Sequence, residues 1–146
     1  MEWLEALRGS TVGLDIAPLI YYIEEHPVYL PKVQPFFEAA ERGELRIVTS
    51  FVTLVEVLVQ PLRRNRPEVA QEYRDILLRS AALTTIPLDE GIAEAAAILR
   101  AERQLRTADA IQVATAIGSG ASWFLTNDEG LADVPGVSSL ILDRLA

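Results

Sequence analysis

Hydrophobic and polar positions divide this chain into short apolar runs separated by longer segments with helical periodicity. The apolar runs predict strands over residues 10–16, 45–50, 83–88, 122–126 and 137–143. The periodic segments predict helices over residues 18–26, 31–42, 51–61, 67–80, 90–103 and 108–120. Strands that alternate with helices favour parallel crossovers, so we expect an α/β fold whose parallel sheet is covered on both faces.

Residues that favour helix ends support these boundaries. Pro18 suits the first turn of a helix, and Gly43 is a typical stop signal. Ser50, Asp89 and Thr107 each precede a helical segment and are predicted to cap it.

Length and composition are those of one globular domain spanning residues 1–146. The chain has 146 residues, of which 50% are hydrophobic and 23% are charged. No apolar run is long enough to span a bilayer, and the N-terminus does not resemble a signal peptide, so we expect no membrane association. The absence of cysteine excludes disulfides and thiolate metal sites, and it is consistent with a cytoplasmic protein.

The charge balance limits the ways in which the chain could meet nucleic acid. A net charge of −8 argues against a non-specific nucleic-acid coat, which would be basic, but it does not exclude an enzyme that acts on nucleic acid. Arg63, Arg64 and Arg66 form a basic cluster that could contact phosphate or could simply be a solvated surface.

Isolated carboxylates are the most informative feature of the sequence. Asp15, Glu56 and Asp109 are each the only charged residue in a long, largely apolar stretch, and Asp128 directly follows an apolar run. An isolated carboxylate is costly to bury unless something pairs with it. All four would be explained if they converged on a cation that is not part of the chain.

The predicted elements place these acids near one edge of the sheet. Asp15 and Asp128 fall at the carboxyl ends of strands, Asp109 lies in the first turn of a helix, and Glu56 lies in a helix that follows a strand. Ligand sites in open α/β sheets occupy this edge. Clustered carboxylates match the oxygen preference of Mg²⁺ or Mn²⁺, which can activate a water and stabilise charge on a phosphate.

Each acid also has a purely structural interpretation. Asp15 could cap a helix, Asp109 could favour the helix dipole, Asp128 could form a turn, and Glu56 could pair with an arginine from elsewhere. His26 is the only histidine and is predicted to cap a helix C-terminus, which argues against a histidine dyad or a multi-histidine zinc site.

Four motifs in order resemble the PIN-domain ribonucleases, including the VapC-type toxins of toxin–antitoxin pairs. They are "VGLDIAPLI" with Asp15, "IVTSFVTLVEVL" with Glu56, "LRTADAIQVATAI" with Asp109 and "FLTNDEGL" with Asp128. The resemblance covers residues 11–143, and the third motif is the most specific. Each motif alone is weak, whereas all four in this order form a strong signal.

The resemblance implies a three-layer α/β/α sandwich around a parallel sheet of about five strands. It also implies that the four acids bind Mg²⁺ or Mn²⁺ and hydrolyse RNA phosphodiester bonds. Thr126 and Asn127 are expected to assist near the last acid, either by holding the metal-binding acids in place or by contacting the substrate. Many toxins of the family form dimers and are inhibited by an antitoxin peptide, so we expect a homodimer and an antitoxin partner.

One departure from the family pattern lies just after the first acid. The family often has hydroxyl residues there, as in Asp-Thr-Ser, whereas this chain has Ile16 and Ala17. A hydroxyl that would help to order a water at the site is therefore missing. The departure removes none of the acids, but it favours slower chemistry or weaker metal binding.

Two other enzyme or signalling classes built on a similar α/β sheet lack their required residues in this sequence. A receiver domain needs an adjacent acidic pair and a lysine after the last strand, but the only lysine is Lys32. A haloacid-dehalogenase-type phosphatase needs Asp-x-Asp, and the third position here is Ala17. The remaining alternative is a non-catalytic PIN-like module that binds RNA or protein. The sequence therefore predicts a metal-dependent endoribonuclease, with the binding module as the alternative.

Overall fold

The computed structural model describes residues 1–146, and its centre is one parallel sheet in the order β3-β2-β1-β4-β5. The strands are β1 (Thr11–Leu14), β2 (Arg46–Ser50), β3 (Leu83–Ile86), β4 (Trp123–Thr126) and β5 (Ser138–Ile141). All four pairings are parallel, and Val12 of β1 lies opposite Ile47 of β2 and Trp123 of β4. The predicted parallel α/β sheet is confirmed.

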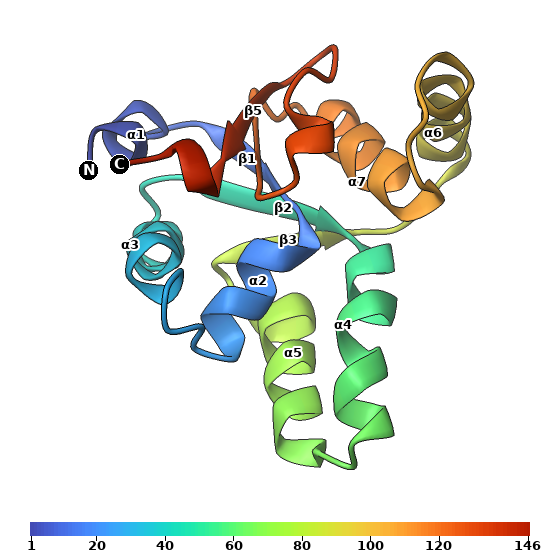
Figure 1. The fold of residues 1–146 in the computed structure, drawn as a ribbon. Helices are drawn as coiled ribbons and strands as arrows, with labels where there is room; N and C mark the ends of the chain where they lie inside the picture. The colour runs from blue at the N-terminus through green and yellow to red at the C-terminus, as the bar shows by residue number, and fades with distance from the viewer.

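Helices cover both faces of this sheet (Figure 1). They are α1 (Glu2–Ala6), α2 (Ile16–Ile23), α3 (Leu30–Glu41), α4 (Phe51–Arg63), α5 (Pro67–Arg79), α6 (Glu90–Glu102) and α7 (Thr107–Gly118). Two short 3₁₀ turns, η1 (Glu129–Leu131) and η2 (Leu142–Arg144), flank β5. Helix α1 and both 3₁₀ turns were not expected from the sequence.

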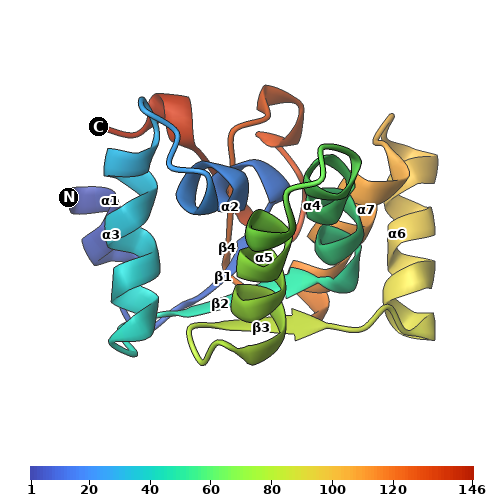
Figure 2. The same cartoon turned by 90° about the horizontal axis from the view of Figure 1, so that it is seen from below.

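The alternation of side chains along the strands produces two separate cores. Val12 and Leu14 of β1 belong to a cluster with residues from α2, α3, α4 and α5. Phe124 of β4 belongs to a second cluster, which includes residues of α6 and α7. The molecule is therefore a three-layer sandwich, as Figure 2 also shows, with α3 and α6 at opposite ends.

Gly13 explains why α7 lies so close to the sheet. A Cβ atom at this position would lie 2.4 Å from the Cβ of Ala116 and 2.9 Å from Cδ1 of Phe124, which no real side chain tolerates. The absence of a side chain lets an alanine-rich face of α7 pack directly on β1. This close packing positions the first turn of α7, which carries Asp109, relative to β1.

Several expected helix ends differ in the structure. Thr107 does not cap α7, because Arg106 has the extended cap conformation and Thr107 is already the first helical residue. Helix α4 continues two residues past Pro61, whose carbonyl still accepts a hydrogen bond from the Arg66 N–H at 2.8 Å. In contrast, Ser50 and Asp89 cap α4 and α6 as predicted.

His26 does not cap the C-terminus of α2 with its side chain. Instead, its Nδ1 accepts hydrogen bonds from the N–H groups of Val28 at 3.1 Å and Tyr29 at 3.3 Å. Helix α2 ends at Ile23, and the backbone then turns at Glu25, whose φ is +52°. The histidine thus fixes the connection into α3, and its ring packs beside Tyr29.

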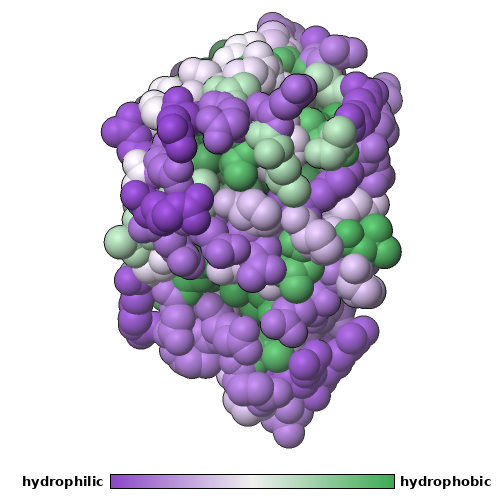
Figure 3. All heavy atoms as spheres, turned by 90° about the vertical axis from the view of Figure 1, so that its left-hand side faces the viewer, coloured by the Kyte–Doolittle hydropathy of each residue, from purple (hydrophilic) through white to green (hydrophobic).

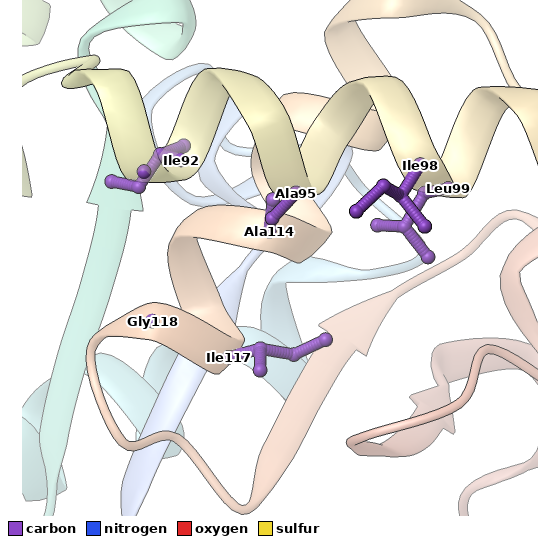
Figure 4. A pocket seen from close by; sticks show the side chains of 8 residues that line it. Ile92, Ala95, Ile98, Leu99, Ala114, Ile117 and Gly118 are labelled. Atoms are coloured by element: carbon purple, nitrogen blue, oxygen red, sulfur yellow. The ribbon is translucent and has the colours of Figure 1, made fainter.

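The surface is largely polar on the side that carries α1, α3 and the two chain ends, with only scattered hydrophobic atoms (Figure 3). None of the helices combines the length and the apolar character that a membrane crossing requires. An apolar hollow of about 280 Å³ lies between α6 and α7, where Ile98 and Ile117 are exposed (Figure 4). None of the four acids lines this hollow.

Candidate active site

All four predicted acids line one cavity of about 460 Å³ at the carboxyl edge of the sheet, here called the acidic pocket. Asp15 directly follows β1, Glu56 lies in the second turn of α4, Asp109 lies in the first turn of α7, and Asp128 follows β4. The other lining residues are Ile16, Ala17, Ile20, Tyr21, Arg106, Asn127 and Glu129.

Asp15 is buried and held by two hydrogen bonds. Its Oδ1 accepts from the Ile16 N–H at 2.8 Å, which caps α2, and its Oδ2 accepts from the Thr126 hydroxyl at 2.6 Å. Burial raises the pKa of Asp15, the two hydrogen bonds lower it in part, and the nearby charges of Asp109 and Asp128 raise it further. The residue is thus a helix cap and also a carboxylate on the wall of the acidic pocket.

Asp109 is also buried, and it has a cationic partner. Its Oδ2 lies 3.0 Å from Nε of Arg106, and the side chains are 10% and 81% exposed respectively. This hydrogen bond and the charge of Asp109 raise the pKa of Arg106. The role of Arg106 was missed at the sequence level, although the three-residue spacing of the pair at a helix start would have indicated it.

The side chains of Glu56 and Asp128 are exposed, unlike those of Asp15 and Asp109. The expectation that Glu56 stands in a buried apolar environment is wrong: α4 buries Thr53, Val57 and Pro61, whereas Val55 is 66% exposed. Glu56 makes no salt bridge, so no arginine neutralises it. Asp128 caps η1, since its Oδ1 accepts from the Gly130 N–H at 2.8 Å.

Thr126 and Asn127 connect the acids to the surrounding chain. The buried Thr126 hydroxyl donates to Asp15 and accepts from the Asp128 N–H at 3.0 Å, so it links two acids. The Asn127 side chain lies 3.4 Å from the hydroxyl of Tyr21. Its carbonyl oxygen accepts from the backbone N–H of Asp143 at 2.9 Å.

Gln112 is a buried polar residue whose role the sequence analysis did not assign. Its Oε1 accepts from the Thr49 hydroxyl at 3.2 Å and from the Ser50 N–H at 3.3 Å, and its Nε2 donates to the Thr53 hydroxyl. Gln112 lies one turn after Asp109, and Thr53 lies one turn before Glu56. This hydrogen-bond network therefore fixes the two helices that carry these acids relative to each other.

The basic cluster is not part of the acidic pocket. Arg63 ends α4, and Arg64 and Arg66 lie in the turn before α5, at the end of this helix pair that points away from the sheet (Figure 1). None of the three lines the acidic pocket. Arg66 instead lines a separate cavity with Glu24 and other residues. Phosphate contacts by this cluster stay a prediction.

The donors of the acidic pocket have the chemistry that a hard divalent cation prefers. They are carboxylate oxygens, and no histidine or cysteine lines the pocket. No three of the acids form a ready-made ligand set in this conformation. Mg²⁺ usually takes one or two carboxylates directly and keeps several waters, so the donor chemistry fits such an ion.

Comparison with known families matches residues 17–137 to the PIN domain. The chain belongs to the PIN-domain family. The match begins two residues after Asp15 and includes the other three acids. It confirms the family resemblance that the four sequence motifs indicated. No curated protein sequence matches the chain.

Several solved structures share the fold of this chain. VapBC2 from Rickettsia felis, bound to a promoter DNA fragment, is 20% identical with a TM-score of 0.72, covering 90% of this chain and 98% of its own. A Klebsiella pneumoniae toxin–antitoxin complex is 26% identical with a TM-score of 0.65, covering 88% and 95%. DNA-bound VapBC from Salmonella typhimurium is 19% identical with a TM-score of 0.69, covering 91% and 98%.

Proposed function

We propose that this PIN-domain protein is a metal-dependent endoribonuclease that hydrolyses RNA phosphodiester bonds. The observation that carries the proposal is the acidic pocket, where Asp15, Glu56, Asp109 and Asp128 come from four separate segments and line one cavity with a single cationic residue. A fifth acid of the lining, Glu129, is paired with Arg144. So many carboxylates repel one another without a counter-ion, and purely structural roles do not require them to share a cavity.

The residues of the pocket have distinct roles in this proposal. Asp15 and Asp109 are held in place by their hydrogen bonds and bind Mg²⁺ or Mn²⁺, and Glu56 and Asp128 complete the site directly or through water. When bound, the ion supplies Lewis-acid chemistry that activates water and offsets the negative charge of the phosphate. Thr126 keeps Asp15 oriented, because its hydroxyl donates to Oδ2.

Two partners follow from the same proposal. The structural relatives include complexes of toxins with antitoxins, and we propose that this chain is a toxin held inactive by an antitoxin protein. The acidic pocket offers a site for a basic group of that antitoxin. We also propose a homodimer, which sedimentation of the purified chain would detect. A cytoplasmic location stays a prediction.

An RNA-cleavage assay tests the nuclease function. Purified protein, freed of any bound inhibitor, is incubated with cellular RNA and Mn²⁺ or Mg²⁺, with and without EDTA. Cleavage should require the metal and disappear in Asp109→Asn. The matched control is Asp133→Asn, which changes an exposed aspartate outside the acidic pocket and should cleave like the wild type.

The alternative is a PIN-like module that binds RNA or protein without cleaving it. One observation favours it: Ile16 and Ala17, which replace the hydroxyl residues of the family pattern, both line the acidic pocket. RNA binding by the wild type with no cleavage under any metal condition, and no thermal stabilisation by Mn²⁺, would support the module over the enzyme.

A further inference from the structure

Arg106 is the one cationic residue among those that line the acidic pocket. It directly precedes α7 and occupies the N-cap position of that helix, so its backbone is fixed by the start of the helix. Its side chain is 81% exposed and extends from this fixed point at the edge of the cavity. The backbone of Arg106 is thus held by the start of α7, while its guanidinium is open to solvent.

Only part of this guanidinium is engaged. Nε donates to Oδ2 of Asp109 at 3.0 Å, while Nη1 and Nη2 make no hydrogen bond within the protein. The other cation near the rim is Arg144, which donates from both Nε and Nη2 to Glu129. Arg106 therefore has free donors beside the four acids, whereas Arg144 is bound to a carboxylate through two nitrogens.

The Arg106–Asp109 pair is of a kind that binding can rearrange. The side chain of Arg106 is 81% exposed, so water competes for its guanidinium and weakens its pairing with the buried Asp109. The guanidinium of Arg106 carries its positive charge at any ordinary pH. A planar guanidinium with free donors matches the non-bridging oxygens of a phosphate, which it can bind with two parallel hydrogen bonds.

We propose that Arg106 contacts the scissile phosphate of the RNA, and that its bond to Asp109 is the resting arrangement of the substrate-free pocket. This role rests on the proposed nuclease function. A phosphate that enters the acidic pocket would be repelled by the carboxylates unless cations offset their negative charge. Arg106 supplies a positive charge from the chain itself, and its donors stabilise the charge that develops on the phosphate oxygens during hydrolysis.

The test uses three variants and two readouts. Arg106→Ala removes the cation, and Arg106→Lys keeps the charge but not the planar fork of donors. Arg103→Ala is the matched control, because Arg103 is an exposed arginine in the same loop that makes no salt bridge and does not line the acidic pocket. Mn²⁺ affinity is measured by calorimetry without RNA, and kcat and KM are measured separately for RNA cleavage.

Arg106→Ala should bind Mn²⁺ at least as tightly as the wild type, because Asp109 no longer has a competing partner. Its kcat/KM should nevertheless fall on the order of a hundredfold, the loss typical of one removed charge-stabilising donor. Arg106→Lys should recover part of this loss, and Arg103→Ala should match the wild type.

Three results would overturn the proposal. If Arg106→Ala cleaved RNA with the kcat/KM of the wild type, the guanidinium would not be needed for the reaction. Loss of Mn²⁺ binding in Arg106→Ala would show that Arg106 organises Asp109 rather than the phosphate. A wild-type protein that binds Mn²⁺ but cleaves no RNA would remove the nuclease function and this role together, which distinguishes the two failures.

Discussion

The two halves of the acidic pocket are built differently. Asp15 and Asp109 are 6% and 7% exposed as whole residues; two hydrogen bonds fix the orientation of Asp15, and Asp109 accepts one from Arg106. Glu56 and Asp128 are exposed, and the carboxylate of Glu56 makes no hydrogen bond or salt bridge. One half of the pocket is thus rigid and desolvated, while the other half is solvated and free to adjust.

This difference separates two tasks that a metal-dependent site must perform. Desolvated carboxylates with fixed orientation provide strong, directional ligands but destabilise the metal-free protein. Solvated carboxylates cost little in the metal-free state and can move towards an ion or a water when substrate arrives. We expect the buried pair to dominate metal binding and the exposed pair to adjust the rate.

The largest effect on RNA cleavage is expected from a substitution in the rigid half of the pocket. Asp15→Asn should lower RNA cleavage by roughly 10²–10³-fold, because it removes a charge that faces the metal and the reacting phosphate. The same change should raise the melting temperature of the protein in EDTA, because a buried charge near two other acids disappears. Cleavage assays and thermal melts check both parts, and a lower melting temperature would contradict the assigned cost of burial.

A smaller effect is expected in the solvated half. Glu56→Gln and Asp128→Asn should each lower cleavage by about tenfold, the lower range for residues that support a metal site. Stability in EDTA should change by less than about 0.5 kcal/mol for Glu56→Gln, since the side chain is exposed and unpaired. Equal losses of activity for the buried and exposed acids would remove the distinction between the halves.

Thr126→Val sharpens the comparison by loosening the rigid half without removing an acid. The substitution leaves Oδ2 of Asp15 and the N–H of Asp128 without their hydroxyl partner. Urea denaturation should show that the free energy of unfolding falls by about 1–3 kcal/mol. Thr115→Val is a control, because its buried hydroxyl bonds only the Ile111 carbonyl of its own helix. Mn²⁺ affinity should weaken in Thr126→Val and remain unchanged in Thr115→Val.

The pH dependence of stability gives the smallest expected effect. Burial raises the pKa of Asp15 above the usual 3.8, so the unfolded chain loses this proton before the folded protein does. The contribution of Asp15 to stability is therefore greatest below about pH 3.8 and is lost as the pH rises through the raised pKa. In EDTA, wild type should lose stability relative to Asp15→Asn as the pH rises from about 4 through the raised pKa of Asp15. A difference independent of pH would contradict the raised pKa.

The sequence predicted the sheet well because strands and helices have distinct periodicities along this chain. It also identified four of the five acids that line the pocket, since isolated charges in apolar stretches are rare enough to stand out; Glu129 was not predicted. It misjudged Glu56, because the apolar letters of α4 were taken as a buried environment, whereas Val55 on the same helix is exposed. Only the docking of a helix decides which of its apolar residues are buried.

Contacts between distant segments were beyond the sequence. The bond from Thr126 to Asp15 joins residues 111 positions apart, and no local pattern indicates it. Gln112 was also missed, although a lone amide in an apolar helix is a usable signal for a buried polar network. The charge density of the basic cluster at Arg63 suggested phosphate contacts there, whereas Arg106 is the cation that lines the acidic pocket.

Calorimetric titration of Mn²⁺ into the metal-free protein tests the central claim most directly. Wild type should bind Mn²⁺ saturably, Asp109→Asn should bind it at least about tenfold more weakly, and the control Asp133→Asn should match the wild type. Wild-type protein that binds no Mn²⁺, or equal binding by wild type and Asp109→Asn, would contradict the assignment of the acidic pocket as a metal site.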